Sequence, residues 1–207
     1  NAIDAVGEAS GGKGPHESSG VSVKLSALHP RYEARQEERV VAELYPRKLR
    51  LSEQAKKWNI GLTFDAEEAD RLVMSLRLFE RHALEPSLKN WEGLGLAVQA
   101  YQKRTRPLIE RLTALARKRG APIQTRLVKG AYWDGEVKRS QIMGRPDFPV
   151  FTTKAATDVH YLACAKDLFR AGGAIFPQFA THNAHTVAGI RRMAATAGRT
   201  DFEFQHL

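Results

Sequence analysis

Several features that mark particular classes of protein are scarce or absent in this sequence. Its single cysteine, Cys164, excludes an internal disulfide and fits a reducing compartment. No apolar window reaches the roughly 18 residues that a membrane-spanning helix needs. The glycine fingerprints GxGxxG and GxxxxGK(S/T) are also missing, which removes the common signals of dinucleotide-binding and P-loop folds. Neither an internal repeat nor a low-complexity tract occurs.

The bulk composition is that of an ordinary globular protein. The chain has 207 residues, of which 43% are hydrophobic and 27% are charged, so one domain with a sizeable core is expected. The net charge of +9 could indicate binding to nucleic acid or to an anionic membrane. However, the excess is spread along the chain, and its short clusters at 103–104 and 117–119 stand beside predicted helices. Solvated helix faces are therefore the favoured explanation.

The two ends of the sequence indicate a piece of a longer protein. There is no signal-peptide pattern and no initiator Met, and residues 1–20 are expected to hold the end of a preceding helix and then an irregular Gly- and Ser-rich loop. The chain stops at Leu207, inside a predicted strand. The remainder, residues 21–207, is expected to form one incomplete barrel domain.

Short apolar runs alternate with helical patterns along this remainder, which favours parallel strands. The expected strands are Val21–Leu25, Ile60–Asp65, Leu94–Tyr101, Ile123–Lys129, Ala174–Phe179 and a last one beginning near Phe202. The expected helices are Gln36–Trp58, broken near Tyr45-Pro46, then Glu67–His82, Pro107–Arg119, Asp134–Met143, Thr153–Arg170 and Ala184–Ala197. The pattern predicts an α/β fold resembling a (β/α) barrel, with at most six of its eight strands.

The stretch RLVKGAYWD, residues 126–134, carries the strongest chemical signal. Arg126 interrupts an apolar run, and a cation inside a buried strand costs on the order of several kcal/mol unless it meets an anion or a polar ligand. Gly130 removes a side chain where a backbone or ligand must come close. Tyr132 and Trp133 add planar apolar surface with a polar group each. The stretch indicates a pocket wall for a planar, partly anionic ligand, with an edge strand and solvated loop as the alternative.

Other apolar runs also end in polar side chains, namely Lys24, Asp65, Gln99 and the group Thr181, His182 and Asn183. In a (β/α) barrel the carboxyl ends of the strands face one mouth, so these side chains are expected to share a site. Asp65 has an alternative interpretation as a helix cap. His182 and His185 stand three apart, but no third metal ligand of the usual kind is near, so a metal site is disfavoured.

Six motifs carry a resemblance to a known family. They are KLSALHPRY (24–32), DAEEADR (65–71), QAYQKR (99–104), RLVKGAYWD (126–134), YLACAK (161–166) and PQFATHNAHT (177–186). In this order they resemble proline dehydrogenase, and most closely the proline dehydrogenase domain of bifunctional bacterial proline utilisation flavoproteins. The resemblance runs over residues 1–207. It implies a distorted (β/α)8 TIM-like barrel, of which this chain supplies about the first six strands.

The implied reaction is FAD-dependent oxidation of L-proline to Δ1-pyrroline-5-carboxylate, with hydride transfer to the flavin N5. By resemblance, Arg126 lies near N5, where a cation favours negative charge on the reduced flavin. Arg126 and Asp65 are the residues expected to act in catalysis, and Gln99 is expected to hydrogen-bond the isoalloxazine ring. The other residues expected at the cofactor are Asp65, Val128, Gly130, Ala131, Trp133, Thr152, Ala180, Thr181, His182 and Asn183.

For the substrate, the resemblance implies that Lys24 holds the proline carboxylate. Tyr132 and Leu207 are expected to form the apolar wall for the pyrrolidine ring. The family's arginine pair that clamps the carboxylate falls beyond the position of Leu207. Because a lone lysine binds a carboxylate less well than a bidentate arginine clamp, the chain by itself is expected to be a poor or inactive enzyme.

The resemblance also implies partners and a location. The electron acceptor is expected to be a membrane quinone, and the parent chain to carry a pyrroline-5-carboxylate dehydrogenase domain. The location is expected to be cytoplasmic, peripheral to the inner membrane, with no metal and no nucleic acid bound by this domain. The alternative is a catalytically inert barrel fragment or a basic surface-binding module for membrane or nucleic acid. Chemical side chains at strand ends favour the enzyme, whereas a binding module would gather its basic side chains on outer helix faces.

Overall fold

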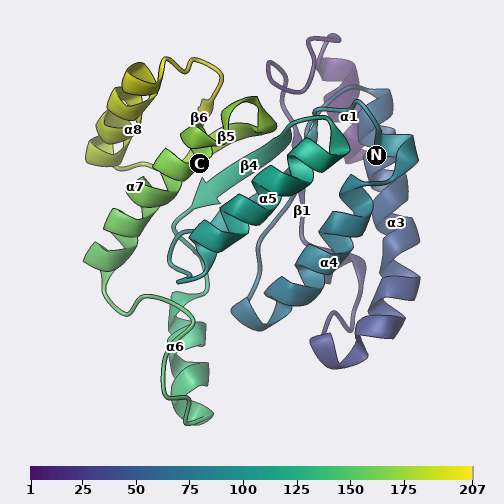
Figure 1. The fold of residues 1–207 in the computed structure, drawn as a ribbon. Coiled ribbons are helices and arrows are strands. Elements are labelled where there is room, and N and C mark those ends of the chain that lie inside the picture. Colours follow the sequence, from purple (N-terminus) through teal and green to yellow (C-terminus); the bar gives the residue numbers. More distant parts are fainter. Residues whose placement is uncertain (207) are drawn as a thin grey trace. The chain divides into compact units, whose positions relative to one another are not determined.

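The computed structural model describes residues 1–206. Its contacts divide the chain into two compact units, residues 1–96 with 115–124, and residues 97–114 with 125–207. Strands β3 (Leu94–Gln99) and β4 (Ile123–Val128) and helix α5 (Thr105–Arg119) each contribute residues to both units. Strands and helices alternate along the chain, as Figure 1 shows.

The first unit is built on three parallel strands. Strand β1 (Val21–Val23) pairs with β2 (Leu62–Phe64), and β2 pairs with the first half of β3 in the register Leu62↔Leu94. All three residues of β2 are buried, which accounts for an apolar run without alternation. The helical elements of this unit are α1 (Ala2–Ala9), α2 (Leu25–Leu28), η1 (Ala34–Gln36), α3 (Glu37–Lys57), η2 (Ala69–Arg71), α4 (Leu72–Ala83) and η3 (Pro86–Leu88).

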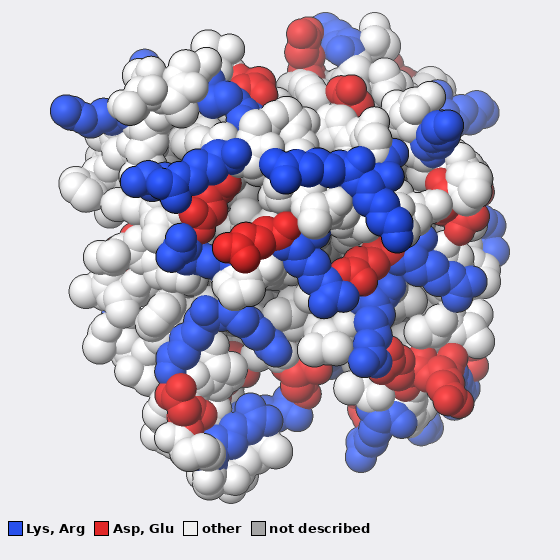
Figure 2. Space-filling model, in the orientation of Figure 1, with Lys and Arg blue, Asp and Glu red and all other residues white. Residues whose placement is uncertain are grey.

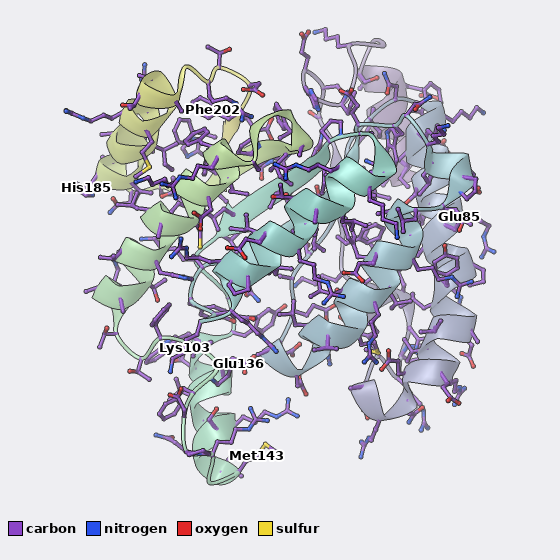
Figure 3. All side chains as sticks on the ribbon, viewed as in Figure 1. Glu85, Lys103, Glu136, Met143, His185 and Phe202 are labelled. Atoms are coloured by element: carbon purple, nitrogen blue, oxygen red, sulfur yellow. The ribbon has the colours of Figure 1, made fainter. Side chains whose placement is uncertain are left out.

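The second unit continues the same alternation. Strand β5 (Ile175–Ala180) pairs in parallel with β6 (Glu203–Gln205), in the register Ala180↔Gln205. The helical elements of this unit besides α5 are α6 (Trp133–Ile142), α7 (Lys154–Arg170), η4 (Gly172–Ala174) and α8 (Ala184–Ala197). Strand β6 is fixed by an aromatic cluster, in which Phe202 lies 5.5 Å from Phe169 and 5.9 Å from Phe179 between ring centroids (Phe202 is labelled in Figure 3).

Lys48 and His82 are basic side chains buried in the core of the first unit. Lys48 on α3 is fully buried, with its Nζ 4.1 Å from the ring centroid of Phe64 and no hydrogen-bond partner among the described residues. Burial holds the pKa of Lys48 well below its ordinary value. His82 on α4 is also fully buried and hydrogen-bonds Ser52 Oγ at 2.7 Å. Burial, and secondly the nearby Lys48, lower the pKa of His82 to about 2.

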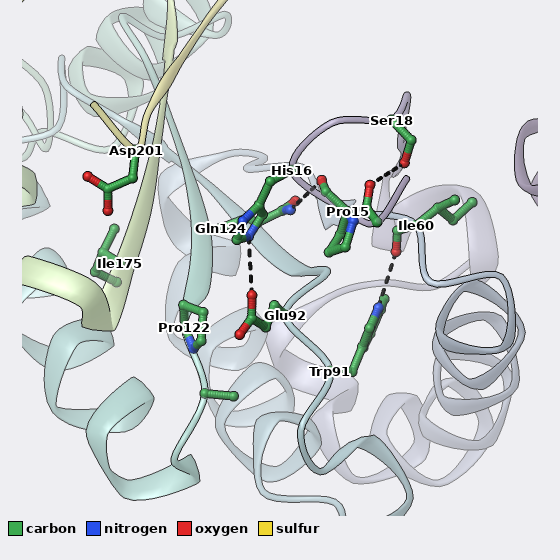
Figure 4. A network of polar contacts seen from close by, with 12 residues as sticks. Pro15, His16, Ser18, Ile60, Trp91, Glu92, Pro122, Gln124, Ile175 and Asp201 are labelled. Atoms are coloured by element: carbon green, nitrogen blue, oxygen red, sulfur yellow. Dashed lines mark hydrogen bonds and ion pairs between the residues drawn. The ribbon is translucent and has the colours of Figure 1, made fainter. Parts of the chain in front are cut away.

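The irregular segment before β1 contacts the residues that precede and begin the strands of the first unit (Figure 4). Gln124 donates to the carbonyl oxygen of Pro15 at 2.9 Å, and His16 lies 3.9 Å from Glu92. Trp91 is buried and donates to the carbonyl oxygen of Ile60 at 3.2 Å. The contact of Gln124 holds the start of β4 to the segment, and the contact of Trp91 joins the residues before β3 to the residue before Gly61 and β2.

Two predicted boundaries are wrong near the first two strands. The predicted strand Val21–Leu25 ends at Val23, and Leu25 begins the short helix α2. The predicted helix from Glu67 begins only at Leu72, after a 3-10 turn, because Glu67 is used in tertiary contacts. Within α4, Leu76 and Phe79 are buried, whereas Val73 is 49% exposed.

The predicted break of the third helix at Tyr45-Pro46 is wrong as well. Helix α3 runs through Pro46 without interruption. Proline inside a helix costs about 3 kcal/mol because it removes one hydrogen bond and crowds the preceding turn. Pro46 is exposed, while Leu44 before it and Lys48 after it are buried on one face. Burial on both sides of Pro46 therefore outweighs the local cost.

Other predictions are confirmed. Helix α8 has the predicted bounds, with Asn183 as its N-cap and Gly198 at φ 62° after its end. Helix α5 ends at Arg119, and Gly120 follows at φ 71°. Cys164 is the small buried residue that its helical pattern indicates, and burial raises the pKa of its thiol to about 12.

The surface charges lie in mixed clusters. Figure 2 shows Lys and Arg interspersed with Asp and Glu on the face in view. Many of the cations are paired within their own unit, such as Arg77 with Glu37 and Arg106 with Asp167. None of the described helices is both long and apolar enough to cross a lipid bilayer.

Candidate active site

Arg126 lies on β4 in the second unit, half-buried between the buried neighbours Thr125 and Leu127. Its Nε donates to Oε1 of Gln205 on β6 at 2.6 Å. The cation in the apolar strand therefore has a polar contact across the strands, as its cost of burial requires. The sequence analysis did not select Gln205, because a single amide in a three-residue strand gives no local signal.

Gln99 ends β3 and is 3% exposed. Its Oε1 accepts a hydrogen bond from the backbone N–H of Ala131 at 3.3 Å. The backbone also joins the two strand ends, because Ala100 and Tyr101 donate to the carbonyl oxygens of Val128 and Lys129, each at 2.8 Å. The structure thus brings Gln99 together with the segment that follows β4.

Gly130 has a positive φ of 141°, a conformation that favours glycine. A Cβ placed there would lie 2.6 Å from the ring of Tyr101, which is buried. The close approach predicted at this glycine is therefore to a protein side chain. Ala131, the next residue, is exposed.

Trp133 begins α6 and remains 41% exposed although its position is fixed. Its Nε1 donates to the carbonyl oxygen of Phe151 at 2.8 Å. Tyr132, which precedes Trp133, and Val128, which ends β4, are half-buried. Thr152 is exposed just before α7. Helix α6 carries the labelled Glu136 and ends next to Met143 in Figure 3.

Lys129 follows β4 and points to a carboxylate on α7. Its Nζ lies 2.5 Å from Oδ1 of Asp158, and Lys154 Nζ lies 2.6 Å from Oδ2 of the same residue. The hydrogen bond from Lys129, and then that from Lys154, hold the pKa of Asp158 below its ordinary value. Lys154 stands in the first turn of α7 and was not selected from the sequence, because it continues no strand.

The end of β5 supplies the next group of predicted residues. Thr181 is buried, and its Oγ1 accepts from the backbone N–H of Asn183 at 3.1 Å. Asn183 Oδ1 accepts from the backbone N–H of Thr186 at 2.9 Å, so this side chain caps α8. Ala180 is half-buried and His182 is exposed.

Tyr161 on α7 ties the ends of β4 and β5 to each other. Its hydroxyl lies within hydrogen-bond distance of the carbonyl oxygens of Leu127, at 3.1 Å, and Ala180, at 3.2 Å. Tyr161 is fully buried, and burial raises the pKa of its hydroxyl. This residue belongs to the YLACAK motif, for which the sequence had indicated no role.

His182 and His185, the pair at which a metal site was disfavoured, are both exposed. The ring of His182 lies 5.7 Å from that of His206 between centroids. His185, labelled in Figure 3, belongs to the first turn of α8. Among residues 1–206 no group of three or more His, Cys, Asp or Glu side chains is arranged to hold a metal ion.

Lys24 and Asp65 belong to the first unit, at the ends of neighbouring strands. Lys24 is exposed and precedes α2, while Asp65 is half-buried and its backbone N–H donates to the carbonyl oxygen of Val23 at 3.0 Å. Asp65 does not cap α4, because that helix begins at Leu72. The alternative interpretation of Asp65 as the cap of this helix is therefore wrong.

Glu67 is a further residue beside Lys24 that the sequence analysis missed. Its Oε1 accepts from the backbone N–H of Ser26 at 3.0 Å, and its Oε2 lies 2.6 Å from Nη1 of Arg71. The carboxylate thus fixes the turn that follows Lys24. The expected helix Glu67–His82 would start at this residue, but α4 begins only at Leu72. Leu207, predicted at the substrate, lies outside the described residues.

Comparisons with known proteins identify the family. The family model described as proline dehydrogenase matches residues 1–207. The chain is 51% identical over 208 aligned positions to the bifunctional protein PutA of Salmonella typhimurium, covering 99% of this chain and 16% of that protein. It is 50% identical over 208 positions to the bifunctional protein PutA of Escherichia coli, with the same coverage. The chain thus spans about a sixth of the length of the curated relatives it matches.

Solved structures agree with this. A PutA mutant from Bradyrhizobium japonicum matches with a TM-score of 0.96 at 51% identity, over 99% of this chain and 21% of that chain. PutA from Bdellovibrio bacteriovorus, inactivated by N-propargylglycine, matches with a TM-score of 0.90 at 30% identity, over 99% of this chain and 23% of that chain. The predicted α/β fold of the TIM-like barrel type is confirmed. The chain belongs to the proline dehydrogenase family.

Proposed function

We propose that this chain is the proline dehydrogenase part of a bifunctional flavoprotein and takes part in the FAD-dependent oxidation of L-proline to Δ1-pyrroline-5-carboxylate. The observation that carries the proposal is family membership at 51% identity, together with Gln99 at the end of β3 and Arg126 within β4. The alternative of a surface-binding module has less support, because the basic side chains on the face in Figure 2 are interspersed with acidic ones.

The second unit has features that fit FAD. The exposed residue Ala131 and the exposed, fixed indole of Trp133 offer surface to a flat, extended ligand. Thr152 and Lys154 stand at the amino-terminal end of α7, where backbone N–H groups and a cation favour phosphate. His182 is exposed at the end of β5. The cofactor-binding set is Asp65, Gln99, Arg126, Val128, Gly130, Ala131, Trp133, Thr152, Ala180, Thr181, His182 and Asn183.

When bound, FAD supplies the acceptor for the hydride of the substrate. Arg126 contributes a fixed positive charge beside the reacting edge, which favours the accumulation of negative charge there. Gln99 is held by Ala131 and by the turn after β3, and it orients the ring through hydrogen bonds. Gly130 acts indirectly in this arrangement, because its contact with Tyr101 sets the path of the backbone through 131.

Lys24 binds the carboxylate of proline, and Asp65 orders the polar groups of the mouth. Tyr132, with Leu207, provides the apolar wall for the pyrrolidine ring. Glu67 supports Lys24 from the side by holding the backbone of Ser26. A quinone at the inner membrane is the electron acceptor in this proposal, and a pyrroline-5-carboxylate dehydrogenase domain in the same protein is the next enzyme. The location is cytoplasmic and peripheral to the membrane.

The test compares two variants in the full-length protein. Arg126→Met is expected to fold, to retain less FAD, and to slow anaerobic flavin reduction by proline about 100-fold or more, as loss of an oriented charge does. Lys24→Ala is expected to keep its FAD and to raise KM about 30-fold or more, through loss of a charge partner worth about 2 kcal/mol or more. Flavin absorbance and stopped-flow bleaching measure both. Wild-type protein that takes up no flavin, or flavin that proline does not bleach, would contradict the proposal.

A further inference from the structure

Three strands of the second unit contribute side chains to one hydrogen-bond network that begins at Arg126. Arg126 Nε on β4 donates to Gln205 Oε1 on β6 at 2.6 Å. Gln205 Nε2 then donates to Glu203 Oε1 at 2.6 Å, and Gln178 Nε2 on β5 donates to the same oxygen at 3.0 Å. Glu203 and Gln205 stand two apart on β6, so both side chains lie on one face of the strand.

The carboxylate of Glu203 determines which way the Gln205 amide points. A carboxylate only accepts hydrogen bonds, whereas an amide has one accepting end and one donating end. The Nε2 of Gln205 must therefore face Glu203, which leaves Oε1 facing the guanidinium. A flipped amide would place two donors together at Arg126 and two acceptors together at Glu203, so both hydrogen bonds would be lost.

The strand pairing fixes Glu203 in its turn. Glu203 is the register partner of Gln178, whose side chain is 5% exposed, and Gln205 is the partner of Ala180. Aromatic contacts of Phe202 and Phe204 with Phe179 anchor the same short strand. The carboxylate is thus held by backbone register as well as by two amides.

We propose that Glu203 is a positioning residue for Arg126 and acts through Gln205. The inference rests on the proposed function of Arg126 beside the flavin. Glu203 itself touches neither cofactor nor substrate in this proposal, and a Gln205 amide that is no longer fixed holds the Arg126 guanidinium less precisely. Because misplacement of a catalytic group by about 1 Å can cost on the order of 100-fold, the effect should appear in the rate of flavin reduction.

The experiment measures flavin content, KM for L-proline and the anaerobic rate of flavin reduction in variants of the full-length protein. Glu203→Leu and Gln205→Leu are each expected to keep FAD and to lower the reduction rate about 10- to 100-fold, with KM changed less than about threefold. Glu203→Gln keeps an accepting oxygen and is expected to restore most of the rate. Glu110→Leu, at an exposed glutamate on α5, is the matched control and should match wild type.

Double variants separate positioning from a merely structural role. In an Arg126→Met background, Glu203→Leu is expected to produce no further loss of rate, because the group it positions is gone. Additive losses would overturn the proposal, and so would a normal reduction rate in Glu203→Leu. If Glu203→Leu fails to fold, the same cycle with Gln205→Leu decides. If proline does not reduce the flavin of the wild-type protein, that result contradicts the proposed function of the site and not the hydrogen-bond network.

Discussion

At the scale of single residues, the candidate site depends on contacts made behind the surface that a ligand would meet. Gly130 lies against Tyr101, Gln99 is held by Ala131, and Arg126 by Gln205. Each contact joins two strand ends that are far apart in the sequence. The residue types could therefore be selected from the sequence, but the side chains that hold them could not.

Gly130→Ala tests this arrangement. The new Cβ would enter the ring of Tyr101 at a φ of 141°, so we expect a loss of about 2–4 kcal/mol in the free energy of unfolding from strain and overpacking. Gly135→Ala is the matched control, since nothing lies within 4 Å of its Cβ and it stands in helix α6. That control should stabilise by about 0.5–1 kcal/mol. Urea unfolding measures both, and equal effects in the two variants would contradict the packing role of Gly130.

At the scale of elements, one arginine in the first unit hydrogen-bonds the backbone at the ends of several helices and strands. Arg119, the last residue of α5, donates to the carbonyl oxygens of Pro122 at 2.8 Å, Trp91 at 2.9 Å, Ala83 at 3.2 Å and Leu88 at 3.3 Å. It therefore satisfies the end of α4, the η3 turn and the entry to β4 with one planar group. Burial lowers the pKa of Arg119.

Arg119→Met is expected to lower the free energy of unfolding by about 2–5 kcal/mol, because it leaves several carbonyl oxygens without a charged donor. Arg119→Lys should recover little of this, since one ammonium cannot reach acceptors spread around a planar fork. The exposed neighbour Arg117→Met is the control and should stay within about 0.5 kcal/mol of wild type. Equal losses in the free energy of unfolding for Arg117→Met and Arg119→Met would contradict the proposed role of Arg119 in holding these segments together.

The elements themselves were largely predictable, and the failures have physical reasons. The bounds of α8 follow from a cap residue and a terminal glycine, which act locally. Pro46 was expected to end a helix, but burial on both sides of it overrides the local preference. Glu67 resembled a helix start, yet it serves the backbone of Ser26 across the unit. Local signals were reliable only where no tertiary contact competed with them.

At the scale of the whole molecule, the response to pH depends on basic groups buried without charge. The folded pKa of Lys48 is lowered well below its ordinary 10.5, so the unfolded chain binds a proton that the folded chain does not. Folding stability therefore falls as pH falls below about 10.5, until the folded pKa of Lys48 is reached. His82 adds a second loss as pH falls from its ordinary 6.5 towards about 2.

Lys48→Met is expected to raise stability at pH 7 by about 1–3 kcal/mol and to flatten the rise of stability between pH 7 and about 10. The reason is that methionine fills the same space beside Phe64 without a group that the unfolded chain can protonate. Lys57→Met, at an exposed position of the same helix, is the control and should leave the slope unchanged. Thermal unfolding at several pH values measures this, and an unchanged slope in Lys48→Met would show that the amine is protonated when folded.

The contact between Gly130 and Tyr101 has a consequence for the evolution of the family. The two positions are 29 residues apart in sequence, but their side chains compete for the same space, since a Cβ at 130 would lie 2.6 Å from the ring of Tyr101. A larger residue can fit at position 130 only after Tyr101 has been replaced by a smaller residue. A smaller residue at position 101 alone leaves a cavity. Substitutions at these positions should consequently be coupled, with tyrosine at 101 retained wherever glycine is retained at 130.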